Sequence, residues 1–181
     1  PGTAGCAVTD GAPLGAFVNA RTGGGSTFAT PMGQTPLAHG VDLVLHSATK
    51  GIAGHNDATI GVVAGSDDLM SWLWGFAVLQ GANASPYDAY NAHRGVRTLD
   101  VRLRQQAESA RLLADFLEAH EAVSDVRYPG LASHPQHELA ERQMRSMGGL
   151  LTFDLAGGLD AGRRFVEATS IARQATSLGG P

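Results

Sequence analysis

The chain has 181 residues, of which 43% are hydrophobic and 17% charged, so it is long enough and apolar enough to fold around a sizeable core. Its formal net charge of −4 argues against a nucleic-acid-binding protein, and no apolar run approaches the about 18 residues that suggest a membrane span. The single cysteine, Cys6, cannot form an intramolecular disulfide and fits the reducing cytoplasm, and we expect no signal peptide at the start of the chain.

The first part of the chain is rich in glycine and other small residues. Residues 1–25 are predicted to be irregular, and residues 21–25 to form a flexible linker. Residues 27–31 are expected to end a strand and enter a turn, because Pro31 keeps the residue before it extended. Residues 36–39 are predicted to form a short helical piece or turn.

An apolar, β-branched run at residues 41–45 predicts a short buried strand, and a polar cluster follows it. The cluster contains Ser47, Thr49 and Lys50, and Lys50 is the only lysine in the chain. A lysine amine can form a Schiff base with a carbonyl, and two nearby hydroxyls could donate to one phosphate. Pyridoxal phosphate carries an aldehyde and a phosphate at about that separation. The pattern alone equally allows an ordinary surface lysine at a strand end.

The middle of the chain predicts a mixture of helices and strands. Residues 58–64 are apolar throughout and predict another buried strand, and residues 67–79 predict an amphipathic helix. The aromatic residues of that helix are expected in the core or at a subunit contact. Residues 86–95 are expected to form an irregular, functional loop. Residues 98–120 predict the longest helix, with Thr98 as its N-cap.

The last third predicts a small α+β domain. Residues 123–128 alternate as a strand does, and a charged helix is expected over residues 137–147. A second strand at residues 149–155 and a helix at residues 160–169 complete the unit. No metal site is predicted, because the histidines lack the HExxH pattern and no cysteine lies near them. A serine hydrolase is also disfavoured, because no G-x-S-x-G elbow is present.

Several short motifs occur in one order between residues 26 and 180. They are Ser26-Thr-Phe-Ala-Thr-Pro31, His46-Ser-Ala-Thr-Lys50, Gly54-His-Asn-Asp57, Arg94-Gly-Val-Arg-Thr-Leu99, Tyr128-Pro-Gly-Leu131, His134-Pro-Gln-His137 and Ser177-Leu-Gly-Gly180. Together they resemble the cysteine/methionine-metabolism family of pyridoxal-phosphate enzymes. That family includes cystathionine synthases and lyases, methionine γ-lyases and acyl-homoserine sulfhydrylases, and its members are much longer than this chain.

The resemblance implies an α/β fold of the type I pyridoxal-phosphate class, similar to aspartate aminotransferase and present only in part. Residues 26–121 would be the second half of the large cofactor domain with a bridging helix. Residues 122–181 would begin the small C-terminal domain. The cofactor domain is then expected to have a mostly parallel sheet covered by helices, with the site at the carboxyl ends of its strands.

The resemblance also assigns roles to individual residues. Lys50 would be the catalytic residue and bind pyridoxal 5'-phosphate as a Schiff base, with Ser47, Thr49 and Thr27 as further cofactor-binding residues. Ser177 and Leu178 would border the carboxylate of the substrate.

Two positions depart from the family's pattern. Gly25 stands where the family has the aspartate that keeps the pyridine nitrogen protonated. Gly51 stands where the family usually has a bulky apolar residue, which leaves more backbone freedom beside Lys50.

The expected function is therefore carbon–sulfur cleavage of a cysteine, cystathionine or methionine type of amino acid by a homodimer or homotetramer. The partner is then a small-molecule substrate, with no nucleic acid and no membrane. One alternative is γ-replacement by a cystathionine γ-synthase or an acyl-homoserine sulfhydrylase. Another is a catalytically silent docking module of a larger protein, since Gly25 replaces the aspartate and half of the fold is absent.

Overall fold

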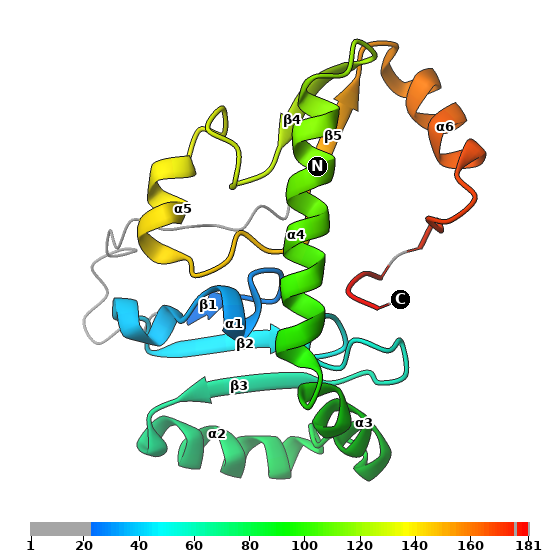
Figure 1. Cartoon of the computed structure of the whole chain (residues 1–181). Coiled ribbons are helices and arrows are strands. Elements are labelled where there is room, and N and C mark those ends of the chain that lie inside the picture. Colours follow the sequence, from blue (N-terminus) through cyan, green and yellow to red (C-terminus); the bar gives the residue numbers. More distant parts are fainter. Residues whose placement is uncertain (1–22, 176, 181) are drawn as a thin grey trace.

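A long central helix connects two small sheets in the computed structural model, which describes residues 23–175 and 177–180. The helix, α4, spans Leu99–Glu118. It runs from the three-stranded sheet and the helices beside it to the two-stranded sheet at the opposite end of the molecule (Figure 1). The predicted helix over residues 98–120 is thus confirmed. Residues 1–22, expected to be irregular, lie outside the described residues.

The three-stranded sheet consists of β1 (Gly23–Gly25), β2 (Leu43–Ser47) and β3 (Gly61–Gly65), in that order. Strand β1 pairs parallel with β2, whereas β3 pairs antiparallel with it. The predicted strand at residues 41–45 begins two residues later and includes Ser47. The linker prediction is wrong for Gly23–Gly25, because the ladder with β2 holds these glycines extended despite their low intrinsic preference for strands.

Strand β3 is shorter and more exposed than expected. The predicted buried strand covered residues 58–64, but the ladder begins at Gly61. Val62 and Val63 keep 40% and 42% of their surface exposed. Val63 is paired with Leu45 of the central strand β2, which is 47% exposed as well, so this face of the sheet is not covered within the described residues.

Two short elements and one long helix surround this sheet. The elements α1 (Thr30–Gly33) and η1 (Pro36–His39) lie between β1 and β2, and the second confirms the predicted short helical piece. Helix α2 spans Asp67–Gln80 and confirms the predicted helix. No residue of α2 is buried within the described structure, so the expected apolar face is not covered there.

Helix α3 (Pro86–Val96) replaces the irregular loop that was expected, so that prediction is wrong. Its start follows ordinary capping chemistry. The Ser85 Oγ accepts from the Asp88 backbone N–H at 3.0 Å and donates to the Asp88 carboxylate at 2.6 Å, and Pro86 opens the first turn. The Ser85 hydroxyl and the Thr59 N–H lower the pKa of Asp88. The Ser-Pro-x-Asp sequence at residues 85–88 could therefore have predicted the start of this helix.

The other end of α4 packs against a small α+β unit. Strands β4 (Val123–Arg127) and β5 (Thr152–Leu155) pair antiparallel, and α5 (His137–Gln143) and α6 (Gly158–Ala168) flank them. All four elements were predicted, although α5 and β5 are shorter than expected. Their core with α4 comprises Ala110, Ala114, Leu117, Val126, Tyr128 and Leu131. Within the described residues, no helix combines the length and apolarity needed to cross a bilayer.

One buried and one partly buried histidine should make the fold sensitive to acid. Desolvation lowers the pKa of His46, which the Ser26 backbone only partly offsets. Desolvation, then His137 and Arg127, lower the pKa of His134. Both folded-state values lie below the ordinary 6.5, so the unfolded chain binds more protons as the pH falls through 6.5 and stability decreases.

We therefore expect the thermal unfolding midpoint to decrease as the pH is lowered from 7.5 to 5.5. The decrease should be about 2 to 4 °C for each kcal/mol of stability that is lost through protonation. Scanning calorimetry over this range measures the slope. His134→Gln should flatten this slope, because the pKa of His134 is lowered in the folded state. A midpoint that stays constant in the unsubstituted protein would contradict the prediction.

Candidate active site

The site begins where the parallel strands β1 and β2 end. The Ser26 N–H donates to the Leu45 carbonyl at 3.0 Å, which extends the ladder by one residue. The Ser47 N–H then donates to the Thr27 Oγ1 at 2.8 Å. Thr27 and Ser47, two of the predicted cofactor-binding residues, are thus adjacent at the carboxyl ends of neighbouring strands.

Lys50 lies in a compact turn that follows β2. Its N–H donates to the Ser47 carbonyl at 3.1 Å, and its own carbonyl accepts from the Gly54 N–H at 2.8 Å. The Ala53 N–H donates to the Ala48 carbonyl at 2.8 Å. Ala48 and Ala53 are fully buried and hold the turn in the core, whereas the Lys50 side chain is partly exposed.

The Lys50 amine meets a residue from the far end of the chain. Its Nζ donates to the Ser177 Oγ at 3.0 Å, across a sequence separation of 127 residues. This contact depends on the glycines that follow Ser177. Gly179 has a φ of +86°, and a Cβ there would lie 2.6 Å from the Gly51 nitrogen; a Cβ at Gly180 would overlap the Asn56 side chain. The Ser177-Leu-Gly-Gly180 segment therefore packs directly on the backbone around Lys50.

Lys50 lines a cavity of about 1160 Å³. Its walls include Thr49, Asp88, Arg173, Ser177 and Leu178. Thr27 lines a second cavity of about 530 Å³ instead, which shares Leu178 and Gly180 with the first. The structure thus brings Lys50, Thr49, Ser177 and Leu178 together at one cavity, and connects Thr27 to this group through the Ser47 N–H.

The hydroxyl of Thr49 is already engaged with the backbone of Ile60. It accepts from the Ile60 N–H at 2.9 Å and donates to the Ile60 carbonyl over a longer 3.3 Å. A hydroxyl hydrogen can rotate, so the weaker donated bond can be exchanged for a phosphate oxygen without loss of the accepted one. The Thr49 position is thus compatible with the phosphate-binding role that the sequence predicts.

The residues fit one half of pyridoxal phosphate better than the other. A cavity-lining amine with hydroxyls nearby suits its aldehyde and phosphate. Gly25, which the family resemblance places at the pyridine end, offers no acidic group, and a Cβ built there meets no atom within 4 Å. The backbone at Gly25 therefore has room for a side chain but supplies no partner for a ring nitrogen.

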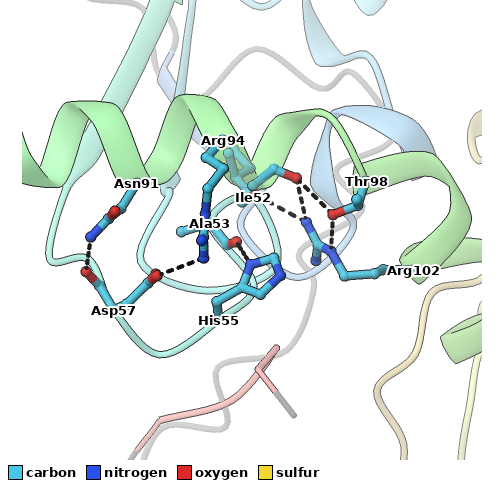
Figure 2. Close-up of polar contacts among 9 residues, drawn as sticks. Ile52, Ala53, His55, Asp57, Asn91, Arg94, Thr98 and Arg102 are labelled. Atoms are coloured by element: carbon cyan, nitrogen blue, oxygen red, sulfur yellow. Dashed lines mark hydrogen bonds and ion pairs between the residues drawn. The ribbon is translucent and has the colours of Figure 1, made fainter.

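A polar network on the other side of the Lys50 turn was not found by sequence reasoning. The Asn91 Nδ2 donates to the Asp57 carbonyl at 2.8 Å, and Arg94 forms an ion pair with the Asp57 carboxylate at 3.2 Å (Figure 2). Arg102 of α4 contacts the same turn further along. The Arg94–Leu99 motif was recognised, but Arg102 lies beyond it, and only its spacing of four from Thr98 could have pointed to a shared helix face.

Comparison with known protein families gives one match over most of the chain. The family model described as Cys/Met metabolism PLP-dependent enzyme matches residues 25–181. It therefore covers every described residue that we placed in the candidate site.

Individual relatives have two kinds of activity. The chain is 47% identical over 154 residues to cystathionine gamma-synthase 1, chloroplastic, of Arabidopsis thaliana, covering 85% of this chain and 27% of the relative. It is 46% identical over 156 residues to the L-methionine gamma-lyase of Pseudomonas putida, covering 85% of this chain and 39% of the relative. The chain thus spans well under half the length of these curated relatives.

Solved structures give the same result for the fold. The crystal structure of cystathionine gamma synthase from Xanthomonas oryzae pv. oryzae, in complex with aminoacrylate and cysteine, matches with a TM-score of 0.87 and 44% identity. The match covers 90% of this chain and 42% of that chain. The described elements therefore reproduce one part of a longer fold.

Proposed function

Since the chain belongs to the Cys/Met metabolism family of PLP-dependent enzymes, we propose that its full-length protein cleaves the carbon–sulfur bond of a sulfur amino acid. The substrate would be of the cysteine, cystathionine or methionine type. The observation that supports this most directly is the Lys50 amine, held 3.0 Å from the Ser177 hydroxyl at the wall of a large cavity. The chain has the type I fold of pyridoxal-phosphate enzymes in part, with the strands β1 and β2 ending at this site.

Pyridoxal phosphate, when bound, supplies an electron sink for the pair left at the substrate Cα. We assign the protein's part of the reaction to four residues. Lys50 would hold the cofactor, and its Nζ would take the proton from the substrate Cα. The same Nζ would give a proton to the departing sulfur, which keeps the electrons of the broken C–S bond. Ser47 and Thr49 would hold the phosphate, and Thr27 would support Ser47 by accepting from its N–H.

The substrate-binding side of the site is assigned to the C-terminal segment. Ser177 and Leu178 line the cavity beside Lys50, and we place the substrate carboxylate against them. The Ser177 hydroxyl also orients the Lys50 amine through its hydrogen bond, so one residue would serve both substrate and base.

γ-Replacement is the second candidate function. Relatives of both reaction types are similar to the chain to nearly the same degree, and a synthase structure matches its fold. In this reaction an acyl-homoserine would lose its acyl group and a thiol would add at Cγ. A catalytically silent docking module is the third candidate, and the absence of a side chain at Gly25 favours it.

Product analysis of the full-length protein tests these three candidates. We expect keto acid from L-cysteine, L-cystathionine or L-methionine: pyruvate after β-cleavage and 2-oxobutyrate after γ-cleavage. Thioether formation from an acyl-homoserine and a thiol, without keto acid, would favour γ-replacement. Failure of both reactions, together with failure of borohydride to fix pyridoxal phosphate on Lys50, would favour the docking module.

We also propose that the full-length protein is a homodimer or homotetramer. Trp72 and Trp74 of α2 are 69% and 66% exposed in this chain, and the rings of Trp72 and Phe76 stack at 6.2 Å. Large aromatic side chains are enriched at protein interfaces. Light scattering at micromolar concentration should give a mass of two or four protomers, and a monomer that still holds the cofactor would contradict the proposal.

A further inference from the structure

Arg102 sits in the first turns of α4 and directs its whole guanidinium group at backbone and hydroxyl oxygens. Its Nη1 donates to the Gly51 carbonyl at 2.9 Å, and its Nη2 donates to the carbonyls of Ile52 at 3.2 Å and Gly95 at 2.8 Å. Its Nε donates to the Thr98 Oγ1 at 3.0 Å (Figure 2). Four hydrogen bonds use most of the five donors of an arginine, and they fix the orientation of the group.

Two of the bonded carbonyls directly follow Lys50 in sequence. The backbone hydrogen bonds of the turn are accepted by the Ser47, Ala48 and Lys50 carbonyls, and not by those of Gly51 and Ile52. A carbonyl that loses contact with water needs a donor, and a charged donor forms a strong hydrogen bond. The Arg102 guanidinium therefore supplies the donors for these two carbonyls.

Arg102 is partly buried, and the backbone packs closely where its guanidinium meets the turn. A Cβ at Gly54 would overlap its guanidinium, and a Cβ at Gly95 would overlap the Ala53 carbonyl. Thr98 holds the Nε and also donates to the Gly95 carbonyl at 3.3 Å. Burial lowers the pKa of Arg102, but an arginine stays protonated under ordinary conditions. The start of α4 and the Lys50 turn are thus joined through one well-determined contact.

This contact matters because the residue after Lys50 is a glycine. Gly51 has no side chain that could lock the backbone beside the lysine, and glycine loses more conformational freedom on folding than any other residue. A hydrogen bond to the Gly51 carbonyl restrains the same peptide from outside. Since the Lys50 Nζ reaches Ser177 on the other side, a movement of this peptide would alter that contact.

We propose that Arg102 is a positioning residue for Lys50. By holding the Gly51 and Ile52 carbonyls against α4, it keeps the Lys50 amine directed at Ser177 and the cavity. That the position of the Lys50 amine matters for catalysis rests on the proposed function. That Arg102 restrains the Gly51 and Ile52 carbonyls does not depend on it. Arg102 touches neither the cavity nor Lys50, so its effect passes through the backbone.

The restraint can be measured on the full-length protein without cofactor. The variants are Arg102→Met, which keeps an apolar stem of similar length, and Thr98→Val, which removes the acceptor of Nε together with the weaker bond from the Thr98 hydroxyl to the Gly95 carbonyl. The matched control is Arg104→Met, a neighbouring exposed arginine paired with Asp100. Hydrogen exchange followed by mass spectrometry reports on residues 48–54, and the rate of acylation at Lys50, read by peptide mapping, reports on the amine.

For Arg102→Met we expect exchange in residues 48–54 to accelerate by at least about tenfold, with the core of the small domain unchanged. Acylation of Lys50 should accelerate as well, by about threefold or more, because the amine leaves Ser177. Thr98→Val should give a smaller change in the same direction, and Arg104→Met none. Retained exchange protection in β4 and β5 verifies that each variant is folded.

The inference is overturned if Arg102→Met and Thr98→Val leave both the local exchange and the acylation rate unchanged. It is also overturned if local exchange accelerates but the reactivity of Lys50 does not change, because the restraint would then not reach the amine. Borohydride trapping of pyridoxal phosphate in the unsubstituted protein tests the proposed function separately. If trapping alone fails, the proposed catalytic role of Lys50 is wrong, but the inference that Arg102 positions Lys50 is unaffected.

Discussion

Replacement of Lys50 by alanine is expected to lower keto-acid release by at least about 10⁴-fold, because in the proposed function one amine is both the covalent anchor and the proton carrier. The fold should survive, since the turn around Lys50 is held by backbone hydrogen bonds and by the buried residues Ala48 and Ala53. Steady-state product assays measure the effect, and circular dichroism verifies the fold.

Two further variants separate the roles of the amine. Lys50→Arg keeps a cation near Ser177 but cannot form a Schiff base, so it should be as inactive as the alanine variant. Ser177→Ala keeps the amine and removes its hydrogen-bond partner, so a loss of about 10- to 100-fold is expected. If reduction with borohydride attaches the cofactor to a residue other than Lys50, the assignment of the site is wrong.

Substitution of Gly25 by aspartate should have the second largest effect, and in the opposite direction. A carboxylate there would keep the pyridine nitrogen protonated and strengthen the electron sink. Gly25 is opposite Leu45 in the parallel ladder, and side chains alternate along a strand, so a side chain there shares the face of Leu45 and Ser47 in β2. The space around its Cβ is open, so the substitution fits without a clash.

We expect Gly25→Asp to raise the rate of C–S cleavage by about 100-fold, which corresponds to about 2.8 kcal/mol of barrier at roughly 1.4 kcal/mol for each factor of ten. Gly25→Asn is the matched control, with the same shape and no charge. An absorbance titration of the bound cofactor would show the change in ring protonation directly. If aspartate and asparagine give the same rate, Gly25 does not adjoin the pyridine nitrogen.

The parts of the fold that could be predicted are those whose signal is local. The apolar stripe of α4 and the alternation of β4 are visible in a few turns or residues of sequence. The Ser47–Lys50 cluster was also readable, because its composition is unusual and Lys50 is the only lysine. The family resemblance placed Ser177 near the substrate, and the structure brings it to Lys50.

The parts that could not be predicted depend on distant segments. Gly23–Gly25 is a strand only because β2 lies beside it, and three glycines carry no strand signal of their own. Arg102 resembles any other arginine of α4 until the Gly51 and Ile52 carbonyls are seen beside it. The loop predicted at α3 is a different kind of error, because the Ser85 cap is a local signal that was not used.

The hydrogen bond between Lys50 and Ser177 also has a consequence for synthesis of the protein on the ribosome. Its two residues are 127 positions apart. At a synthesis rate of about 5–20 residues per second, Ser177 is therefore added on the order of ten seconds after Lys50. During that interval the nascent chain can build the local turn around Lys50, but it cannot close the cavity. Contacts of such high sequence separation also form slowly. A cofactor that binds during translation would therefore meet a solvent-exposed Lys50 that does not yet have Ser177 as its hydrogen-bond partner.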